Sequence, residues 1–425
     1  MPGLVPDKRH RVDVTIVMPC LNEAGTLPAC IRTARQALGE LRARGLSGEI
    51  VIADNGSRDA STGIARKARC RVVTCTSPGY GNAITAGCAA ARGRYIVMGD
   101  ADASYDFRES VPMVTRLTEG YDLCMGARFK GRIMPGAMPW KNRRIGNPVL
   151  TGILNIFFHS GLSDVHSGLR AFTKAAFEKM RLSSTGMEMA SEMVVKATLL
   201  RLKRTEVPIT LYPDRRGRPS HLKPWRDGWR HLKFLLMYSP LWLYFLPAAA
   251  LLLFGGAVLT LLMLTPPGSV YSLGYFWIGD HWAIVAGGII SAGYLAFLFG
   301  MIAIAYHDQQ QFLPVARAVR RIHRFMTVEN AIIFGMAKLL LGAAVIGYVF
   351  FKWKASSFGT LVQYRSMVIA TTLIVMGFMD SFAGFMLSLP GLSFPAADEP
   401  FSTGQPAPAR ASTKIRSPRR QLFRK

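Results

Sequence analysis

The sequence predicts an α/β domain with a mostly parallel sheet, followed by an α-helical transmembrane region of four spans. In the first half of the 425 residues, short apolar runs rich in β-branched residues alternate with helical patterns. This alternation is typical of a parallel sheet with helices on both faces. After Pro240 the chain contains four apolar windows of about 20 residues or more, and each is long enough to cross a bilayer.

The first four strands are expected where the apolar runs lie. These runs are VTIVMP (14–19), EIVIAD (49–54), CRVVTC (70–75) and RYIVMGD (94–100). Ligands of such sheets bind beyond the carboxyl ends of the parallel strands. The polar segments expected at that edge are residues 19–23, 54–57, 77–81 and 100–106.

The chain is expected to divide into four parts. They are a soluble domain over residues 1–221, a juxtamembrane segment over 222–239, the membrane region over 240–390 and a basic, disordered tail over 391–425. The expected spans are residues 240–264, 282–305, 331–351 and 367–389. The segment 222–238 mixes Trp225, Trp229 and Phe234 with basic residues, which favours an interfacial helix over a plain linker with aromatic anchors.

The charge balance limits the class of protein and predicts its orientation. The chain carries 52 Lys and Arg against 26 Asp and Glu, a net charge of +26, which suggests anionic partners such as nucleic acid, acidic lipid or phosphorylated substrates. The four spans argue against nucleic acid.

Basic residues flank the spans before 240, within 306–330 and after 400, so these segments are expected in the cytosol. Arg365 and two lysines in the 352–366 loop disagree with this orientation.

Two charged residues lie inside the predicted spans. Lys338 is about seven residues from the cytosolic end of the third span, and Asp380 is about nine from that of the fourth, so their depths differ by about 3 Å. We expect them to form an ion pair between adjacent helices, since an unpaired charge there is costly. The alternative is that Lys338 reaches the interface and Asp380 faces a wet cavity.

The stretch VMGDADASYDF places Asp100, Asp102 and Asp106 directly after the fourth strand. A solvated turn is one interpretation, and a divalent metal site is the other, since hard cations prefer carboxylate oxygens. The cluster shares its edge with three other polar turns, which favours a site. Successive side chains alternate along a strand, so Asp100 and Asp102 reach one metal only if the strand has ended in a turn.

Six blocks of the sequence resemble family 2 glycosyltransferases. In order they are MPCLNEAGTL, IADNGSRD, GYGNAITAG, GDADASYDF, GARFKG and SGLRAF. Within that family the pattern is similar to polyprenyl-phosphate (dolichyl-phosphate) glucose/mannose synthases, and PGAMPWKNRRIGNPVLTG and RDGWRHLKFLL resemble the bacterial dolichyl-phosphate-glucose synthase-like branch. The resemblance covers about residues 12–240 and implies a GT-A fold, a Rossmann-like α/β catalytic domain.

The resemblance implies a catalytic Mg²⁺ or Mn²⁺ held by Asp100 and Asp102, with Asp100 also close to the nucleotide ribose. Ser104 stands where mannose-type relatives carry Gln, and Ala103 where this branch more often carries Asp. Asp106 is a further candidate ligand.

The resemblance also implies a nucleotide-sugar pocket. Its expected members are Pro19, Asn22, Glu23, Asp54, Gly56, Gly81, Asp100 and Arg215, with Gly79 beside Gly81 in a tight turn. Helix capping is an alternative role for Asn22 and Glu23. Arg215 and Ser220 match a family segment in which His221 replaces the usual Lys.

The acceptor implied by the resemblance is a lipid phosphate. Arg128 and Arg143 match catalytic positions that hold this phosphate, with Asn147 one turn further along, and a planar guanidinium suits phosphate oxygens. Solvated arginines are the alternative. Arg170, Glu188 and Glu192 are further candidates, and the two glutamates, at i and i+4, either bind sugar hydroxyls or form ion pairs.

The implied function is inverting, metal-dependent transfer of a hexose from a nucleotide sugar to polyprenyl phosphate. The branch resemblance suggests UDP-glucose as donor, and GDP-mannose and UDP-N-acetylglucosamine are the alternatives. The enzyme would be a multi-pass protein of the cell (inner or plasma) membrane with its catalytic domain in the cytosol. One alternative is a processive polysaccharide synthase, although the sequence contains no Q-x-x-R-W block. The other is a non-catalytic membrane scaffold with a degenerate transferase domain.

Overall fold

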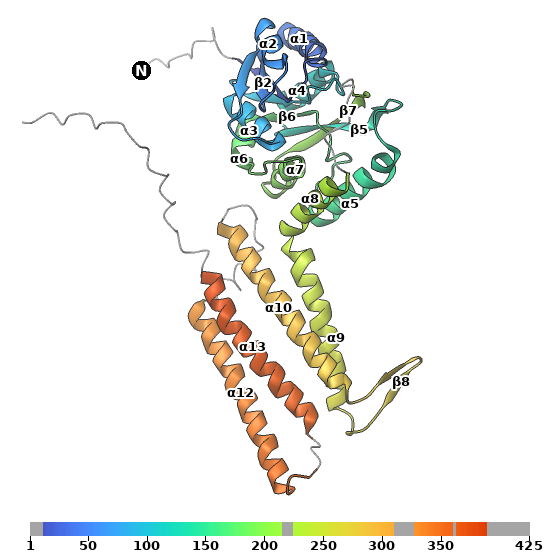
Figure 1. The fold of residues 1–425 in the computed structure, drawn as a ribbon, viewed down its shortest axis with the longest axis vertical. Coiled ribbons are helices and arrows are strands. Elements are labelled where there is room, and N and C mark those ends of the chain that lie inside the picture. The colour runs from blue at the N-terminus through green and yellow to red at the C-terminus, as the bar shows by residue number, and fades with distance from the viewer. Residues whose placement is uncertain (1–11, 215–223, 310–326, 360–362, 389–425) are drawn as a thin grey trace, which may run out of the picture.

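The computed structural model describes residues 12–214, 224–309, 327–359 and 363–388. Figure 1 shows an α/β domain, here called the head, at one end of the molecule and a bundle of long helices at the other. The segment that holds Arg215, Ser220 and His221, and the tail after residue 390, lie outside the described residues.

The head contains a seven-stranded sheet in the order β3-β2-β1-β4-β6-β5-β7. The strands are β1 Val14–Cys20, β2 Gly48–Asp54, β3 Arg71–Thr74, β4 Tyr95–Met98, β5 Leu123–Ile133, β6 Arg170–Thr173 and β7 Arg204–Leu211. β1 pairs in parallel with β2 and β4, β2 pairs in parallel with β3, and only β6 runs antiparallel to its neighbours in this sheet. The predicted mostly parallel α/β fold is therefore confirmed.

Helices cover both faces of this sheet. They are α1 Leu27–Ala43, α2 Ser61–Lys67, α3 Tyr80–Ala90, α4 Ser110–Thr118, α5 Asn147–Phe158, α6 Lys174–Met180 and α7 Met189–Leu199, with short helices η2 Phe107–Glu109 and η3 Asn142–Gly146 before α4 and α5. Alternation along β1 divides the core: Ile16 and Met18 pack with residues of α1 and α4, and Val17 packs with residues of α3.

The strand register brings the predicted ligand segments to one edge. Cys20 lies beside Asp54, Asp54 lies beside Thr74, and Val17 lies beside Met98. Because β1 to β4 are mutually parallel, their carboxyl ends, and the loops that follow them, lie at the same edge of the sheet.

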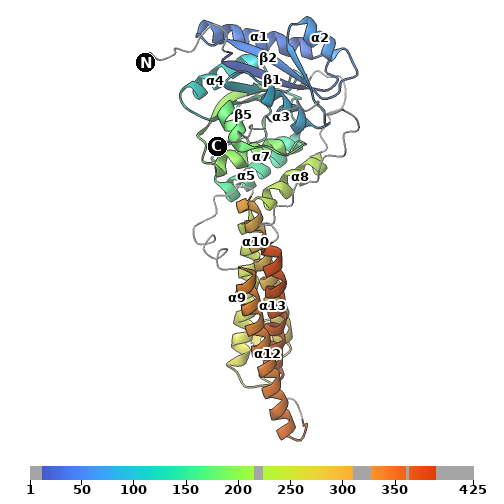
Figure 2. The same cartoon turned by 90° about the vertical axis from the view of Figure 1, so that its left-hand side faces the viewer.

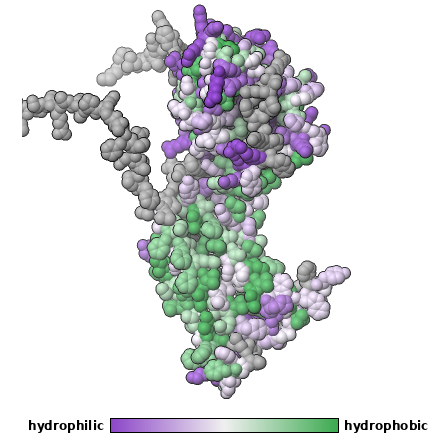
Figure 3. All heavy atoms as spheres, viewed as in Figure 1, coloured by the Kyte–Doolittle hydropathy of each residue, from purple (hydrophilic) through white to green (hydrophobic). Residues whose placement is uncertain are grey.

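The bundle contains the four predicted spans. Long apolar helices cover Leu241–Met263, Trp282–His307, Val328–Ala355 and Tyr364–Ser388, and each is long and apolar enough to cross a membrane. The corresponding elements are η4 Leu241–Phe245 with α9 Leu246–Met263, α10 Trp282–Gln309, α12 Val328–Ala355 and α13 Tyr364–Ser388. Hydrophobic residues cover the bundle, whereas the head is mainly polar (Figure 3).

Two smaller elements complete the fold. Helix α8, Pro224–Met237, lies between the head and the bundle in both ribbon views (Figures 1 and 2). A short hairpin of β8 Tyr271–Leu273 and β9 Phe276–Ile278 connects the ends of α9 and α10 that are farthest from the head.

The predicted ion pair inside the bundle is confirmed. Lys338 Nζ on α12 lies 2.5 Å from Asp380 Oδ2 on α13. The hydroxyl of Tyr294 on α10 accepts a hydrogen bond from Lys338 Nζ at 2.6 Å and donates one to Asp380 Oδ1. The three residues thus join three helices and leave neither charge without a partner.

Arg365, one of the basic residues that disagree with the predicted orientation, lies at the end of the bundle farthest from the head. It is a buried residue of the first turn of α13 and not a loop charge. Its Nε donates to Asp280 at 2.8 Å, and its other nitrogens donate to the carbonyls of Leu262, Thr265 and Pro266. The guanidinium is therefore neutralised within the protein, which reduces the disagreement with the predicted orientation.

Candidate active site

Residues 99–106, here called the aspartate loop, follow β4, which ends at Met98. Ala103 has a left-handed backbone with φ 63°, so Asp100 and Asp102 lie in a turn, as a shared site requires. Asp102 is buried, and its Oδ1 accepts a hydrogen bond from the Ser104 N–H at 2.9 Å. Asp106 caps η2 and forms an ion pair with Arg108 at 2.5 Å, which gives it a structural role, and its metal ligation stays a prediction.

The loop after β1 is fixed to both neighbouring loops. Asn22 has a φ of 58°, and its Oδ1 accepts from the Arg58 N–H at 2.7 Å. The Glu23 N–H donates to Ser61 Oγ at 2.9 Å, and Thr26 donates to the Ala101 carbonyl of the aspartate loop at 2.7 Å. Helix α1 begins at Leu27 with Thr26 as its cap residue, so neither Asn22 nor Glu23 occupies the cap position. The Glu23 carbonyl does accept the Thr26 and Leu27 N–H groups, at 3.1 and 2.9 Å, at the start of this helix.

Pro19, Asp54 and Gly56, also expected in the nucleotide pocket, lie at the same edge. Pro19 is in the last part of β1, beside Ala53 of β2. Asp54 is the buried last residue of β2, and its Oδ1 accepts from the Ser57 N–H at 3.1 Å. Gly56, with φ at +90°, lies in the turn between Asp54 and Ser57, and a β-carbon on Gly56 would meet no atom within 4 Å.

Gly79 and Gly81 allow close packing against the segment before α7. A β-carbon on Gly79 would lie 2.4 Å from the Thr185 carbonyl oxygen, and one on Gly81 would lie 2.1 Å from that of Ser184. The Gly81 N–H donates to the Thr185 carbonyl at 2.9 Å, and the Gly79 N–H donates to Asn55 Oδ1 at 3.1 Å. These two N–H groups therefore fix the turn around Tyr80.

Tyr80 links this turn to the aspartate loop. Its hydroxyl donates to Asp100 Oδ1 at 2.8 Å. Burial, followed by the negative charge of Asp100, raises the pKa of Tyr80 well above its ordinary value, so the hydroxyl keeps its proton. Sequence reasoning missed Tyr80, because a tyrosine between two glycines carries no distinct signal of this contact.

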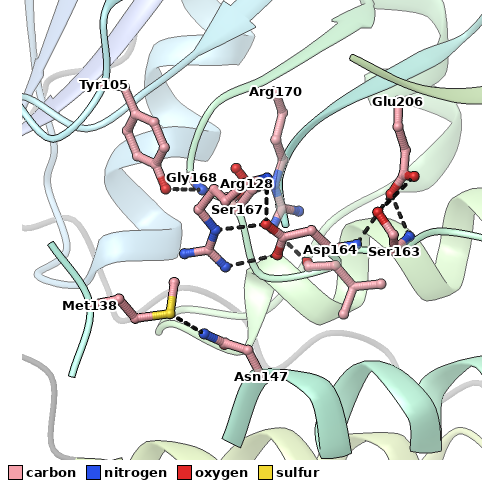
Figure 4. Close-up of polar contacts among 11 residues, drawn as sticks. Tyr105, Arg128, Met138, Asn147, Ser163, Asp164, Ser167, Gly168, Arg170 and Glu206 are labelled. Carbon is pink, nitrogen blue, oxygen red and sulfur yellow. Dashed lines mark hydrogen bonds and ion pairs between the residues drawn. The ribbon is translucent and has the colours of Figure 1, made fainter. Parts of the chain in front are cut away.

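Arg128 forms a two-point ion pair with Asp164. Its Nε lies 2.7 Å from Asp164 Oδ2, its Nη2 lies 2.8 Å from Oδ1, and its backbone N–H donates to Oδ2 at 3.0 Å. Asp164 is fully buried, and Figure 4 shows the pair beside Tyr105 and Gly168. Asp164 is 36 positions away in the chain, and sequence reasoning missed it.

The loop that contains Asp164 also reaches the aspartate loop. The Gly168 N–H donates to the Tyr105 hydroxyl at 2.9 Å. A β-carbon on Gly168 would lie 2.4 Å from Asp100 Oδ2. Residues 164–168 therefore connect the surroundings of Asp100 with those of Arg128.

The other residues expected at the acceptor site lie on η3 and α5. Arg143 is an exposed residue of η3. Asn147 is the first residue of α5, and its Nδ2 lies 3.4 Å from Met138 Sδ. Figure 4 shows Asn147 on the α5 side of Arg128.

Arg170 and Glu192 have structural roles instead of the ligand contacts considered from the sequence. Arg170 is fully buried and donates to the carbonyls of Ser167, Ala190 and Val165 at 2.7–3.0 Å. Glu192 pairs with Lys196 at 2.6 Å inside the protein. Glu188 Oε1 accepts from the Gly186 N–H at 3.2 Å, so it stabilises the start of α7.

The donor set at the aspartate loop suits a hard divalent cation that also binds phosphate. Among the residues that the structure describes, no group of three or more His, Cys, Asp or Glu side chains could hold a metal alone. Mg²⁺ and similar ions commonly use one or two carboxylates together with water and substrate phosphates. Asp102 with Asp100 therefore fits a metal bound jointly with a diphosphate.

Helices α5 and α8 present a mixed apolar and basic surface near the bundle. Around α5 the exposed apolar residues are Trp140, Ile145, Val149 and Ile156, beside the exposed Lys141, Arg143 and Arg144. On α8 the exposed residues include Trp229, Arg230, Lys233 and Met237. Phe157 of α5 stacks on Trp242 of the first span with ring centroids 5.2 Å apart, so this surface joins the bundle directly.

Comparisons with known proteins agree with this architecture. Residues 15–181 match the model of Glycosyl transferase family 2, and residues 301–391 match that of the Glycosyltransferase family 2 C-terminal transmembrane region. The chain is 37% identical over 379 residues to the low-salt glycan biosynthesis hexosyltransferase Agl6 of Haloferax volcanii, with 88% of each chain covered. It is 34% identical to glycosyltransferase AglJ of the same organism, over 51% of this chain and 68% of that protein.

A solved structure is also similar. Glucosyl-3-phosphoglycerate synthase from Mycobacterium tuberculosis, in complex with Mn²⁺, UDP and glucosyl-3-phosphoglycerate, aligns with a TM-score of 0.41 and 20% identity over 53% of this chain and 80% of that one.

The fold and the family matches define a membrane-attached glycosyltransferase that uses a nucleotide sugar. The chain belongs to glycosyl transferase family 2. The alternative of a non-catalytic scaffold is therefore set aside.

Proposed function

We propose that this transferase moves a hexose from a nucleotide sugar to polyprenyl phosphate, with inversion, at the cytosolic face of the cell membrane. One observation carries the proposal: the 164–168 loop contacts both Asp100 and Arg128, and helices α5 and α8 of the same domain adjoin the first span. We therefore expect a soluble donor and a membrane-bound acceptor to meet in this part of the head.

The donor would lie at the sheet edge. Asp54 and the loop that holds Asn22 and Glu23 would surround the nucleotide, because they lie at the carboxyl ends of β1 and β2. Asp102 and Asp100 would hold a Mg²⁺ or Mn²⁺ together with the diphosphate. When bound, this ion stabilises the negative charge that develops on the departing nucleotide.

The acceptor would approach from the membrane side. Exposed Arg143 lies next to apolar side chains that suit an interfacial position, and Asn147 follows one turn later. A lipid phosphate is already anionic at neutral pH, so its oxygen can attack the anomeric carbon without a strong general base. Attack from the face opposite the diphosphate inverts the anomeric configuration.

Arg128 would act differently from a free surface arginine. Three of its donors, the backbone N–H, Nε and Nη2, are bound by Asp164, which fixes the plane of the guanidinium. Nη1 lies outside that pair and is the nitrogen we assign to the acceptor phosphate. Preorganisation of this kind strengthens the stabilisation of charge in a buried site.

Two observations support a hexose and, more specifically, glucose. The relative Agl6 is named a hexosyltransferase, and sequence blocks around Arg143 and α8 resemble dolichyl-phosphate-glucose synthase-like proteins. UDP-glucose is therefore the first donor to test.

The test uses membranes that contain the full chain. They are incubated with labelled UDP-glucose, GDP-mannose or UDP-N-acetylglucosamine, with and without undecaprenyl phosphate, and the lipids are extracted. We expect label in a lipid that depends on the added phosphate and is lost with chelator. Label in a water-soluble polymer, or no dependence on polyprenyl phosphate, would contradict the proposal.

A further inference from the structure

Asp100 is enclosed by side chains and backbone from two other loops. Its Oδ1 accepts the Tyr80 hydroxyl at 2.8 Å, and its Oδ2 lies so close to Gly168 that a β-carbon there would be at 2.4 Å. Tyr80 and Gly168 therefore bring two further chain segments into contact with this carboxylate.

Tyr80 is itself held rigidly. It is the first residue of α3, between Gly79 and Gly81. The N–H groups of these glycines donate to Asn55 Oδ1 and to the Thr185 carbonyl, and both glycines pack against residues 184–185 too closely for any larger residue. Two other chain segments thus fix the backbone on both sides of Tyr80.

We propose that Tyr80 is a positioning residue that orients the Asp100 carboxylate for the metal–diphosphate of the donor. The inference rests on the proposed function, because it assigns Asp100 to that site. A hydrogen bond from a fixed hydroxyl restricts rotation of the carboxylate and so sets the direction of its oxygens. Residues that hydrogen-bond to a metal-binding carboxylate commonly affect metal affinity strongly.

The first variant removes only the hydroxyl. Tyr80→Phe keeps the ring, and Tyr95→Phe is the matched control, because Tyr95 begins β4 at the opposite edge of the sheet from Asp100. Binding of UDP to the purified full chain is measured by calorimetry with Mn²⁺ and with EDTA, and GDP is tested in parallel. Melting temperatures are recorded for all variants.

We expect Tyr80→Phe to weaken Mn²⁺-dependent UDP binding by about 10-fold to 100-fold. Binding in EDTA and the melting temperature should stay close to those of Tyr95→Phe. In transfer assays the variant should need a correspondingly higher Mn²⁺ concentration for half-maximal rate. A purely structural role would instead lower the melting temperature and weaken both kinds of binding together.

A second variant acts on the other oxygen of the same carboxylate. Gly168→Ala would force Asp100 Oδ2 to move, and we expect the same selective loss of Mn²⁺-dependent binding. Wild-type affinity in Tyr80→Phe, or an equal loss in EDTA, would overturn the positioning role. If Mn²⁺-dependent binding depends on Tyr80 but no sugar reaches polyprenyl phosphate, the positioning role stands and the acceptor assignment fails.

Discussion

Arg128 and Asp164 are joined by two parallel hydrogen bonds, Nε to Oδ2 at 2.7 Å and Nη2 to Oδ1 at 2.8 Å, inside the head. The pair connects β5 to the loop before β6, strands that are adjacent and antiparallel. Because both side chains are buried, each charge depends on the other for its compensation.

Asp164→Ala should destabilise the head strongly. It leaves the Arg128 guanidinium buried without its carboxylate, a change that costs about 3–5 kcal/mol in comparable pairs. Thermal unfolding of the purified protein measures the effect. Arg116→Ala is the matched control, because it removes an exposed ion pair with Glu119, and it should leave the melting temperature almost unchanged.

Asp102→Asn should abolish transfer without unfolding the protein. The substitution keeps an oxygen that can accept the Ser104 N–H but removes the charge, so we expect the rate to fall by about 100-fold or more. The measurement is lipid-linked product formed per enzyme at saturating Mn²⁺.

The variant Asp106→Ala tests whether Asp106 acts as a metal ligand or only as the cap of η2. Asp106 accepts from the Arg108 N–H at 3.0 Å as the cap of η2, so its loss should cost about 1 kcal/mol of stability. Transfer by the folded fraction should remain near the wild-type rate. A loss of transfer as large as that caused by Asp102→Asn would instead identify Asp106 as a metal ligand.

Much of the fold could be predicted from local patterns. The β-branched runs located β1 to β4, and apolar length located all four spans, because both signals depend only on nearby residues. The depth of Lys338 and Asp380 followed from the helical rise alone. By contrast, the position of β6 between β4 and β5 depends on pairings distant in sequence, and four residues carry too little pattern to predict it.

The candidate site was less predictable for the same reason. Arg170 was a candidate ligand-binding residue, but its partners are three backbone carbonyls. Contacts to backbone carbonyls leave no trace in the residue types of a sequence. Gly81 was expected in a tight turn of the nucleotide pocket, and its close packing against Ser184 appears only in three dimensions. Asp164 carries no signal that would assign it to Arg128.

The Tyr294–Lys338–Asp380 cluster should stabilise the bundle mainly by mutual compensation. Lys338→Met leaves the Asp380 carboxylate with only the Tyr294 hydroxyl, and an unpaired charge at mid-span costs roughly 2.5–3.5 kcal/mol. The melting temperature in detergent should therefore fall.

The double variant Lys338→Met/Asp380→Leu tests the same idea in the opposite direction. With both charges removed, we expect much of the lost stability to return, since packed apolar residues replace a buried pair well. A double variant less stable than either single variant would show that the cluster contributes more than charge compensation.

His166 should make the stability of the protein depend on pH. Its Nε2 lies 3.3 Å from Ser191 Oγ, which also contacts Nδ1 of His231 on α8 at 2.8 Å. Burial first, and then the positive charges of His231, Arg128 and Arg170, lower the pKa of His166 well below its ordinary value. The folded protein therefore resists protonation of a ring that titrates freely once unfolded.

The direction of the pH effect follows from proton binding. Below about pH 6.5 the unfolded chain takes up a proton at His166 that the folded chain does not, so stability falls as pH falls from about 6.5. His166→Asn should reduce the drop in melting temperature between pH 7 and pH 5. His159→Asn, at an exposed helix end, should leave that drop unchanged, and equal pH profiles for wild type and His166→Asn would exclude His166 as its source.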